Sequence, residues 1–336
     1  MKYDWSNTDL GLFPFRSPGR KGTSTNMSLP VEEKLLSVII PSYNEELNIR
    51  NTASTVARIL DGHQIAFEII FVDDGSKDAT YQKIKEAKEA DGRVRGAKFS
   101  RNFGKESCIF AGLSLARGAC AVVMDCDLQH PPEVIPKMYA LWQEGYEVVE
   151  GVKADRGQES LAHKLSAGLF YRVISKCSGI DMESSSDFKL LDRKVVDTLV
   201  ELKERNTFFR ALSFWVGYRS ATIEFEVAER EFGVTKWSVK SLARYAVNNV
   251  TSFSAAPLYF VMIVGVIFTL GSIILGLQTL IRFILGYAVE GFTTVILLIL
   301  ITGGLLMLSL GIIGYYIAKI YDEIKERPRY IISETI

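Results

Sequence analysis

Residues 119–129 read Ala-Cys-Ala-Val-Val-Met-Asp-Cys-Asp-Leu-Gln, and this stretch decides how most of the chain is interpreted. Ala119–Met124 is a short apolar run that stops at an acidic pair, which is the pattern of a buried strand followed by a polar loop. Similar runs recur with helical stretches between them, an order typical of an α/β fold with a largely parallel sheet and helices on both faces. The predicted strands are Leu36–Ile40, Phe67–Val72, Val94–Phe99, Ala119–Met124 and Glu147–Val152, and the predicted helices lie near 46–60, 78–90, 105–116 and 133–144.

Acidic residues follow three of these predicted strands. Glu45 comes after the first strand, Asp73 after the second, and Asp125 and Asp127 after the fourth. Ligands of parallel sheets bind at the carboxyl ends of the strands, where these side chains would repel one another unless they held a cation or sugar hydroxyls. An isolated Asp-x-Asp is often only a turn, but the other acidic strand ends favour a site. Oxygen-only ligands favour Mg²⁺ or Mn²⁺. The sequence has no GxGxxG or GxxxxGK[ST] motif, so neither a dinucleotide site nor a P-loop is expected.

Charge is distributed unevenly along the 336 residues. The 39 basic and 39 acidic side chains cancel, and no basic block points to nucleic acid as a partner. Residues 255–336 hold only ten of these charges. Within them, the apolar runs 255–281 and 291–318 are each longer than the about 20 residues that span a bilayer as a helix. Two buried core helices would seldom need such length, so a transmembrane hairpin is expected.

The basic residues that flank this hairpin predict its orientation. Lys236, Lys240 and Arg244 precede the first span and Lys319, Lys325, Arg327 and Arg329 follow the second, whereas the connecting loop has only Arg282. By the positive-inside rule, both termini and the sheet domain face the cytoplasm. The four cysteines form no CxxC pair, which fits a reducing compartment. The expectation is therefore an integral protein of the inner, or cytoplasmic, membrane.

The remaining boundaries follow from composition. Residues 1–34 are predicted to be a mobile tail, residues 35–235 a soluble domain, and residues 319–336 a cytoplasmic tail. Two amphipathic segments, near 160–178 and 236–254, have a basic stripe beside an apolar one. They are expected to lie as helices in the headgroup region, although an ordinary helix with a solvated basic face has the same pattern.

Four ordered segments resemble a known family. They are Ser37-Val-Ile-Ile-Pro-Ser-Tyr-Asn-Glu-Glu46, Val72-Asp-Asp-Gly-Ser76, Ser100-Arg-Asn-Phe-Gly-Lys-Glu106 and Asp125-Cys-Asp-Leu-Gln-His-Pro-Pro-Glu133. Together they resemble family 2 glycosyltransferases of GT-A fold, and within them the polyprenyl-phosphate glycosyltransferases, such as dolichyl-phosphate mannose synthases and bacterial undecaprenyl-phosphate glucosyltransferases. The resemblance covers residues 35–254, and the two spans fit the bacterial subgroup.

The resemblance implies roles for individual residues. Around the base and ribose of the donor it implies Pro41, Tyr43, Glu45 and Asp73. At the metal and the diphosphate it implies Asp125 and Asp127, with Gln129 close to the metal. It also implies that Arg230 and Lys236 lie on a loop that meets phosphates. Membrane-surface attraction would also explain the two loop bases. The implied catalytic residues are Asp127 and Asp187, the latter facing donor sugar and acceptor. Relatives often have Gly where this chain has Ser186.

The acceptor phosphate must lie beside the membrane that holds its lipid. Lys153, Arg156 and Lys164 follow the last predicted strand and are candidates to bind it, although relatives commonly have Arg near this point, where this chain has His163 and Lys164. His130 belongs to the Asp-x-Asp segment, but a lone His is more often structural.

The resemblance implies transfer of a hexose, with glucose from UDP-glucose favoured, to undecaprenyl phosphate by single displacement with inversion. GDP-mannose and a UDP-aminoarabinose-type donor stay open, as does the role of Asp187 as an orienting group, an electrostatic stabiliser or a base. A processive polysaccharide synthase is disfavoured because Gln-x-x-Arg-Trp is absent, and a non-catalytic scaffold because the three Asp residues are present. Glycines in both spans would permit the close helix contacts of a homo-oligomer, although small residues are common in such spans.

Overall fold

The central sheet is mixed, with a parallel core. The computed structural model describes residues 32–153, 186–204, 208–226, 256–287 and 291–336. Within them the sheet has eight strands in the order β7-β5-β6-β4-β1-β2-β3-β8. The strands are β1 (Glu32–Ser42), β2 (Phe67–Asp73), β3 (Val94–Phe99), β4 (Gly118–Val123), β5 (Val148–Lys153), β6 (Lys189–Asp192), β7 (Ser220–Phe225) and β8 (Ile332–Thr335). Strands β4, β1, β2 and β3 are parallel, whereas β6 is antiparallel to both β4 and β5, and β8 to β3.

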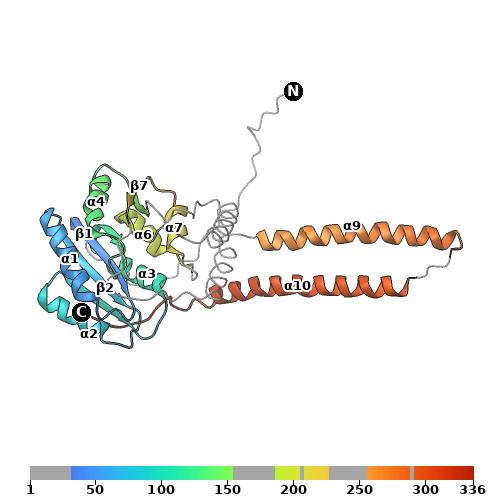
Figure 1. Cartoon of the computed structure of the whole chain (residues 1–336), viewed down its shortest axis with the longest axis horizontal. Coiled ribbons are helices and arrows are strands. Elements are labelled where there is room, and N and C mark those ends of the chain that lie inside the picture. Colours follow the sequence, from blue (N-terminus) through green and yellow to red (C-terminus); the bar gives the residue numbers. More distant parts are fainter. Residues whose placement is uncertain (1–31, 154–185, 205–207, 227–255, 288–290) are drawn as a thin grey trace, which may run out of the picture.

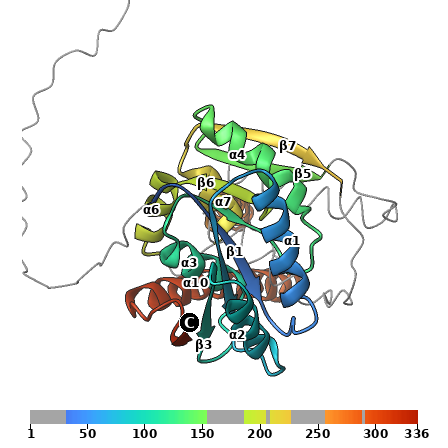
Figure 2. The same cartoon turned by 90° about the vertical axis from the view of Figure 1, so that its left-hand side faces the viewer.

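Helices cover both faces of the sheet, as predicted. On one face lie α1 (Ile49–Gly62), α2 (Thr80–Ala90) and α4 (Ile135–Gln143), which follows the short 3-10 helix η1 (Pro132–Val134). On the other lie α3 (Lys105–Leu115), α6 (Arg193–Glu201) and α7 (Phe209–Trp215). The alternation within β1 explains this division, because Val38 and Ile40 pack on the first face and Ile39 on the second. Figure 2 shows β1 between α1 and α3.

Helix α3 lies unusually close to the sheet. A Cβ on its Gly112 would fall 2.2 Å from Cγ2 of Ile39, so only glycine permits this approach. The close packing fixes the height of α3 above β1. It thereby fixes the N-terminus of α3, which starts at the carboxyl edge of the sheet.

The α/β fold with helices on both faces is confirmed, and each of the five predicted strands is found. Strand β1 begins at Glu32, inside the predicted tail 1–34. Strands β6, β7 and β8 were not predicted. Most of the predicted tail and both amphipathic segments lie outside the described residues.

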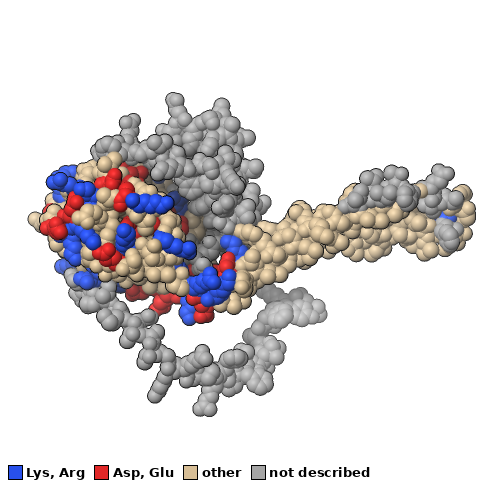
Figure 3. All heavy atoms as spheres, turned by 90° about the horizontal axis from the view of Figure 1, so that it is seen from below, with Lys and Arg blue, Asp and Glu red and all other residues tan. Residues whose placement is uncertain are grey.

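Two long helices extend from the sheet domain as a hairpin (Figure 1), α9 (Ala256–Ile284) and α10 (Phe292–Ile324). The stretches Pro257–Arg282 and Ile301–Ile324 are long and apolar enough to cross a membrane, and neither is buried against the rest of the chain. Figure 3 shows charged side chains over the sheet domain and a largely uncharged hairpin surface. An apolar surface of this size indicates membrane association.

The chain returns to the sheet after α10. The segment 319–336, expected to be a tail, instead forms the end of α10 and then strand β8 on the edge of β3. Tyr330 stacks on Phe99 with ring centroids 5.1 Å apart, and Ile336 and Gly96 exchange backbone hydrogen bonds. The return also covers the edge of β3. An open edge strand can pair with other chains, so this cover removes a site of unwanted association.

Candidate active site

A cleft of about 360 Å³ opens at the carboxyl edge of the parallel strands, where ligands of such sheets bind. Its lining comes from the loops after β1, β2, β3 and β4 and from the start of α3. The lining residues are Pro41, Ser42, Tyr43, Glu45, Asp74, Asn102, Gly104, Lys105, Cys108, Asp125, Cys126 and Asp127. A larger hollow of about 1350 Å³ lies beside the end of α10 and contains none of these strand-end residues. We therefore place the candidate site at the strand ends.

Two loops of this cleft are held in strained conformations. Asn44, after β1, and Leu128, after β4, have φ angles of 55° and 56°, in the left-handed region that non-glycine residues seldom adopt. Asn44 is fixed from both sides, because its N–H donates to Ser76 Oγ at 2.9 Å and its Oδ1 accepts from the N–H of Lys77 at 3.0 Å. Such strain persists where neighbouring structure enforces it and is common at functional sites.

Of the residues expected around the nucleotide, three line the cleft and one is buried behind it. Pro41, Tyr43 and Glu45 line the cleft, with Tyr43 exposed. Asp73 is fully buried, and its Oδ1 accepts from the N–H of Ser76 at 2.9 Å. Its neighbour Asp74 lines the cleft instead and accepts from the N–H groups of Phe103 and Gly104. A contact between Asp73 and a nucleotide stays a prediction.

The Asp-x-Asp loop presents two carboxylates to the cleft. Asp127 Oδ1 accepts from the N–H of Gln129 at 3.2 Å, and Asp125 Oδ1 lies 2.6 Å from Lys105 Nζ. Burial disfavours charge on Asp125, but the Lys105 ammonium outweighs it and lowers the pKa of that carboxyl. The oxygens of Asp125 and Asp127 suit a hard divalent cation. No three His, Cys, Asp or Glu side chains in the described ranges converge as a metal cage, so a cation here would need further ligands from water or a diphosphate.

His130 packs beneath the protein surface against the Asp-x-Asp loop and holds it in place. It is buried, its Nδ1 accepts from the backbone N–H of Asp125 at 3.1 Å, and its ring stacks on Phe188 with centroids 5.0 Å apart. Burial lowers the pKa of His130, so the ring is neutral and its Nδ1 is free of a proton. The structural interpretation of this histidine fits these contacts, since it ties the loop of Asp125 to the segment that carries Asp187.

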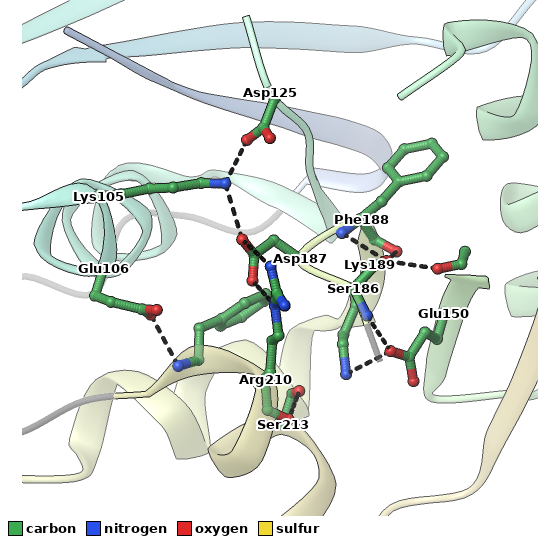
Figure 4. A network of polar contacts seen from close by, with 12 residues as sticks. Lys105, Glu106, Asp125, Glu150, Ser186, Asp187, Phe188, Lys189, Arg210 and Ser213 are labelled. Atoms are coloured by element: carbon green, nitrogen blue, oxygen red, sulfur yellow. Dashed lines mark hydrogen bonds and ion pairs between the residues drawn. The ribbon is translucent and has the colours of Figure 1, made fainter. Parts of the chain in front are cut away.

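Asp187 is the centre of an ionic cluster, shown in Figure 4. Its Oδ2 lies 2.8 Å from Lys105 Nζ, and its two oxygens accept from Arg210 Nε at 2.6 Å and Nη2 at 3.1 Å. Its side chain is only 7% exposed. Burial opposes ionisation, yet Lys105 and Arg210 together hold the pKa of Asp187 far below its usual range. Asp187 is therefore a carboxylate held by two cations.

The backbone on either side of Asp187 is anchored to β5. Ser186 donates its N–H to Glu150 Oε1 at 2.8 Å and its hydroxyl to the carbonyl of Gly151. Lys189 is buried, and its Nζ lies 3.2 Å from the same oxygen of Glu150. Ser186 stands where relatives often have Gly, and its hydroxyl adds a hydrogen bond to Gly151 that a glycine could not make, whereas the N–H bond to Glu150 would be available to either residue.

Three residues of this cluster have no role that the sequence predicts: Lys105, Glu106 and Arg210. Glu106 Oε2 accepts from the N–H of Phe209 at 2.8 Å, which joins the start of α3 to the start of α7 and brings Arg210 to Asp187. Burial, with the Asp187 carboxylate nearby, raises the pKa of Glu106 to about 7. Lys105 and Glu106 belong to the segment Ser100–Glu106 that carries the resemblance, whereas no motif marks Arg210.

The residues expected at the acceptor phosphate are only partly described. Lys153 is exposed at the end of β5. Because β5 and β4 are both antiparallel to β6, they point the same way, and Lys153 lies at the same edge of the sheet as Asp125. Arg156, Lys164, Arg230 and Lys236 lie outside the described residues.

Comparison with known proteins identifies the family of this chain. The family model described as glycosyl transferase family 2 matches residues 37–200, which include the cleft and Asp187. A glycosyltransferase of Bacillus subtilis, YkcC, is 38% identical over 301 residues, covering 89% of this chain and 93% of that protein. The bactoprenol glucosyl transferase of Shigella phage SfV is 36% identical over 300 residues, covering 89% of this chain and 98% of that protein.

Solved structures are more distant. A mycobacterial protein aligns with a TM-score of 0.48 and 19% identity over 66% of this chain and 75% of that chain, and nothing about the site follows from it. The alignments with YkcC and the phage protein cover nearly the full length of each relative at well over 30% identity. The family model matches the sheet domain of the same chain. The chain therefore belongs to glycosyl transferase family 2 and is a glycosyltransferase.

Proposed function

We propose that this enzyme transfers glucose from UDP-glucose to undecaprenyl phosphate at the cytoplasmic face of the membrane, with inversion at the anomeric carbon. The observation that carries the proposal is the ionic cluster at the strand ends, where Lys105 joins Asp125 of the Asp-x-Asp loop to Asp187. Two helices apolar enough to enter a membrane belong to the same chain. Relatives named bactoprenol glucosyl transferase support the choice of sugar and acceptor.

In this proposal the donor binds in the cleft at the ends of β1 and β4. Pro41, Tyr43 and Glu45 border the nucleotide, and Asp125 and Asp127, with Gln129 beside them, hold Mg²⁺ or Mn²⁺. Such a cation, when bound, neutralises negative charge on the leaving diphosphate. Lys105 lines the same cleft and adds a fixed positive charge next to these carboxylates.

The ion pairs of Asp187 favour an orienting role over proton abstraction. A carboxylate whose pKa is held so low by Lys105 and Arg210 is a poor proton acceptor. The nucleophile, a lipid phosphate, is already an anion and needs no base. We infer that one oxygen of the lipid phosphate attacks the anomeric carbon as the bond between that carbon and the diphosphate oxygen breaks. Meanwhile Asp187 holds the side chains of Lys105 and Arg210 in place.

The acceptor side of the proposal rests on the edge of the sheet next to β5. Lys153 lies at that edge, and Arg156 and Lys164 follow it in the sequence. Positive charge at this edge would bind a phosphate whose lipid stays in the bilayer. Arg230 and Lys236 are proposed to meet the phosphates of the donor, and the basic residues that flank the hairpin orient it with both termini in the cytoplasm.

The test is a donor panel with the purified full-length protein in vesicles that contain undecaprenyl phosphate and Mg²⁺ or Mn²⁺. We expect labelled glucose from UDP-glucose to enter the lipid fraction, and label from GDP-mannose or a UDP-aminoarabinose not to do so. Asp127→Ala should abolish transfer. Asp197→Ala is the matched control, because Asp197 is an exposed aspartate on α6, and it should leave transfer unchanged. Transfer from one of the other donors but not from UDP-glucose would show that glucose is the wrong sugar. Undiminished transfer in Asp127→Ala would reject the role of the Asp-x-Asp loop.

A further inference from the structure

Lys105 is the cation that bridges the two acidic segments of the site. It begins α3 directly after Gly104, whose φ of 96° demands glycine, and the backbone N–H of Gly104 is held by Asp74. Its Nζ lies 2.6 Å from Asp125 and 2.8 Å from Asp187, as Figure 4 shows, and its side chain is 41% exposed. Both contacts are therefore charge-assisted hydrogen bonds that face an open cleft.

The two carboxylates depend on Lys105 to different extents. Asp187 also has Arg210, which binds both of its oxygens. Asp125 has a contact of 3.9 Å to His130 Nδ1, but that nitrogen accepts a hydrogen bond from the backbone of Asp125 and so carries no proton there. Among the ion pairs of the described residues, that with Lys105 supplies the positive charge for Asp125.

A divalent cation on Asp125 would lie close to the Lys105 ammonium whichever oxygen of that carboxylate it bound, because Lys105 Nζ lies 2.6 Å from Oδ1. Asp125 offers its carboxylate to the cleft together with Asp127, and Lys105 lies directly on its Oδ1. Two cations held by one carboxylate repel each other. If Lys105 leaves Asp125, its ammonium keeps a negatively charged partner, because Asp187 also lies within hydrogen-bond distance of it.

We propose that Lys105 is an exchangeable internal counter-cation, which neutralises Asp125 while no metal is bound and gives up that carboxylate when a divalent cation binds. The inference rests on the metal site of the proposed function. Its consequence is that Lys105 weakens metal binding to the empty enzyme. Metal binding is then favoured when a nucleotide diphosphate arrives with further ligands, so metal and donor bind cooperatively.

The test measures binding of Mn²⁺ alone, without donor, to the full-length protein in detergent, with free Mn²⁺ followed by electron paramagnetic resonance. Lys105→Met removes the competing charge and should tighten Mn²⁺ binding about tenfold or more, since a charged hydrogen bond corresponds to at least that factor. Lys105→Arg keeps a cation and should bind Mn²⁺ more weakly than Lys105→Met. Lys83→Met removes a lysine from the exposed face of α2 and should match the wild type.

The outcomes separate this inference from the proposed function. If Asp127→Ala abolishes Mn²⁺ binding but Lys105→Met binds as the wild type or more weakly, the exchange is wrong and the metal site stands. If neither the wild type nor Lys105→Met binds Mn²⁺, the metal site itself is wrong and the exchange falls with it. Binding of Mn²⁺ by Lys105→Met where the wild type shows none would support the exchange.

A second measurement needs no neutral variant and applies even if Lys105→Met does not fold. Labelling lysines with ¹⁵N at Nζ keeps their charge and all three N–H donors, and the Lys105 signal is identified by its loss in Lys105→Arg. Addition of Mg²⁺ without donor should shift this signal with the same half-saturation as metal binding. A signal that does not move while Mg²⁺ binds would overturn the exchange.

Discussion

The strand-end cleft and the α9–α10 hairpin solve opposite problems. In the cleft, Asp125 after β4 and Asp187 before β6 lie within reach of each other, and Lys105 and Arg210 compensate their charge. In the hairpin, apolar side chains such as Phe260 and Met307 are 60% and 72% exposed and have no protein partner over most of their surface. One region concentrates charge and pairs it internally, whereas the other presents an apolar surface of the length and composition that a membrane would cover.

This difference indicates a division of labour between two regions that the chain joins at both ends of the hairpin, and the connection after α10 is also packed against the sheet domain. The packed connection is the return segment after α10, where Tyr330 stacks on Phe99 and β8 pairs with β3. Phe99 also contacts Phe103, edge to face at 5.7 Å, and the N–H of Phe103 donates to Asp74 in the cleft. The end of the hairpin is thus packed against residues that support the site.

The largest effect is expected in the cleft itself. Asp187→Asn removes the carboxylate that holds Lys105 and Arg210, so transfer should fall about a hundred- to a thousand-fold, as when a preorganised electrostatic group is lost. Initial rates of lipid-linked product measure it. The same change at Asp197, exposed on α6, should have no effect. A rate for Asp187→Asn within a few-fold of the wild type would remove Asp187 from the mechanism.

The next effect tests the other side of the comparison. Leu270 lies in the middle of α9 and is 55% exposed, so Leu270→Lys would place a charge at the centre of the bilayer at a cost of about 2.5 to 3.5 kcal/mol. The fraction of protein that resists alkaline extraction from membranes should fall. Ile284→Lys, at the end of α9, should be tolerated because the ammonium reaches the interface. Equal extraction of the two variants would argue that α9 does not span the membrane.

A smaller effect is expected at Glu106, where burial raises the pKa to about 7. Folded Glu106 binds its proton more tightly than the unfolded chain does, so this residue makes stability fall as pH rises from about 4.5 to about 7. Glu106→Gln should remove that fall, which is a few kcal/mol at most because one pKa unit is about 1.4 kcal/mol. Thermal midpoints at pH 5 and pH 8 measure it. The stability gained over the wild type should be larger at pH 8, whereas Glu89→Gln, on the exposed side of α2, should show no such trend.

The smallest effect concerns the return segment. Tyr330→Ala removes the ring that stacks on Phe99 and the hydroxyl that lies 3.0 Å from that of Ser114. We expect a loss of at least about 1 kcal/mol in unfolding free energy, because an aromatic pair contributes about that much beyond the area it buries. Tyr330→Phe keeps the stack and should lose less. If both variants were as stable as the wild type, the return segment would contribute no measurable packing to the sheet domain.

The parallel core could be predicted from the sequence because its strands are apolar runs that end in polar residues. Strand β6 could not, since it is four residues long and contains the charge of Lys189, which is buried only because Glu150 pairs with it. Strand β8 follows a long apolar helix, and nothing local indicates that it returns to β3.

The site was predicted to a similar extent. Asp125, Asp127 and Asp187 lie in one region, as the family resemblance implied, but their metal and catalytic roles stay predictions. The cations that hold Asp187 could not be predicted, because Lys105 and Arg210 are 82 and 23 residues away from it and meet it only through tertiary packing. The sequence also does not indicate that Asp74 lines the cleft whereas Asp73 beside it is fully buried.

The central claim is a direct, metal-dependent transfer from a nucleotide sugar to a lipid phosphate by the strand-end cluster. Its most direct test is the configuration and yield of the lipid product made by the full-length protein in vesicles from UDP-glucose, followed by NMR of the anomeric proton and by UDP release. We predict a β-linked glucosyl lipid, formed in a one-to-one ratio with UDP and lost when the divalent cation is chelated. An α-linked product, or UDP release that continues without lipid phosphate or metal, would contradict the account.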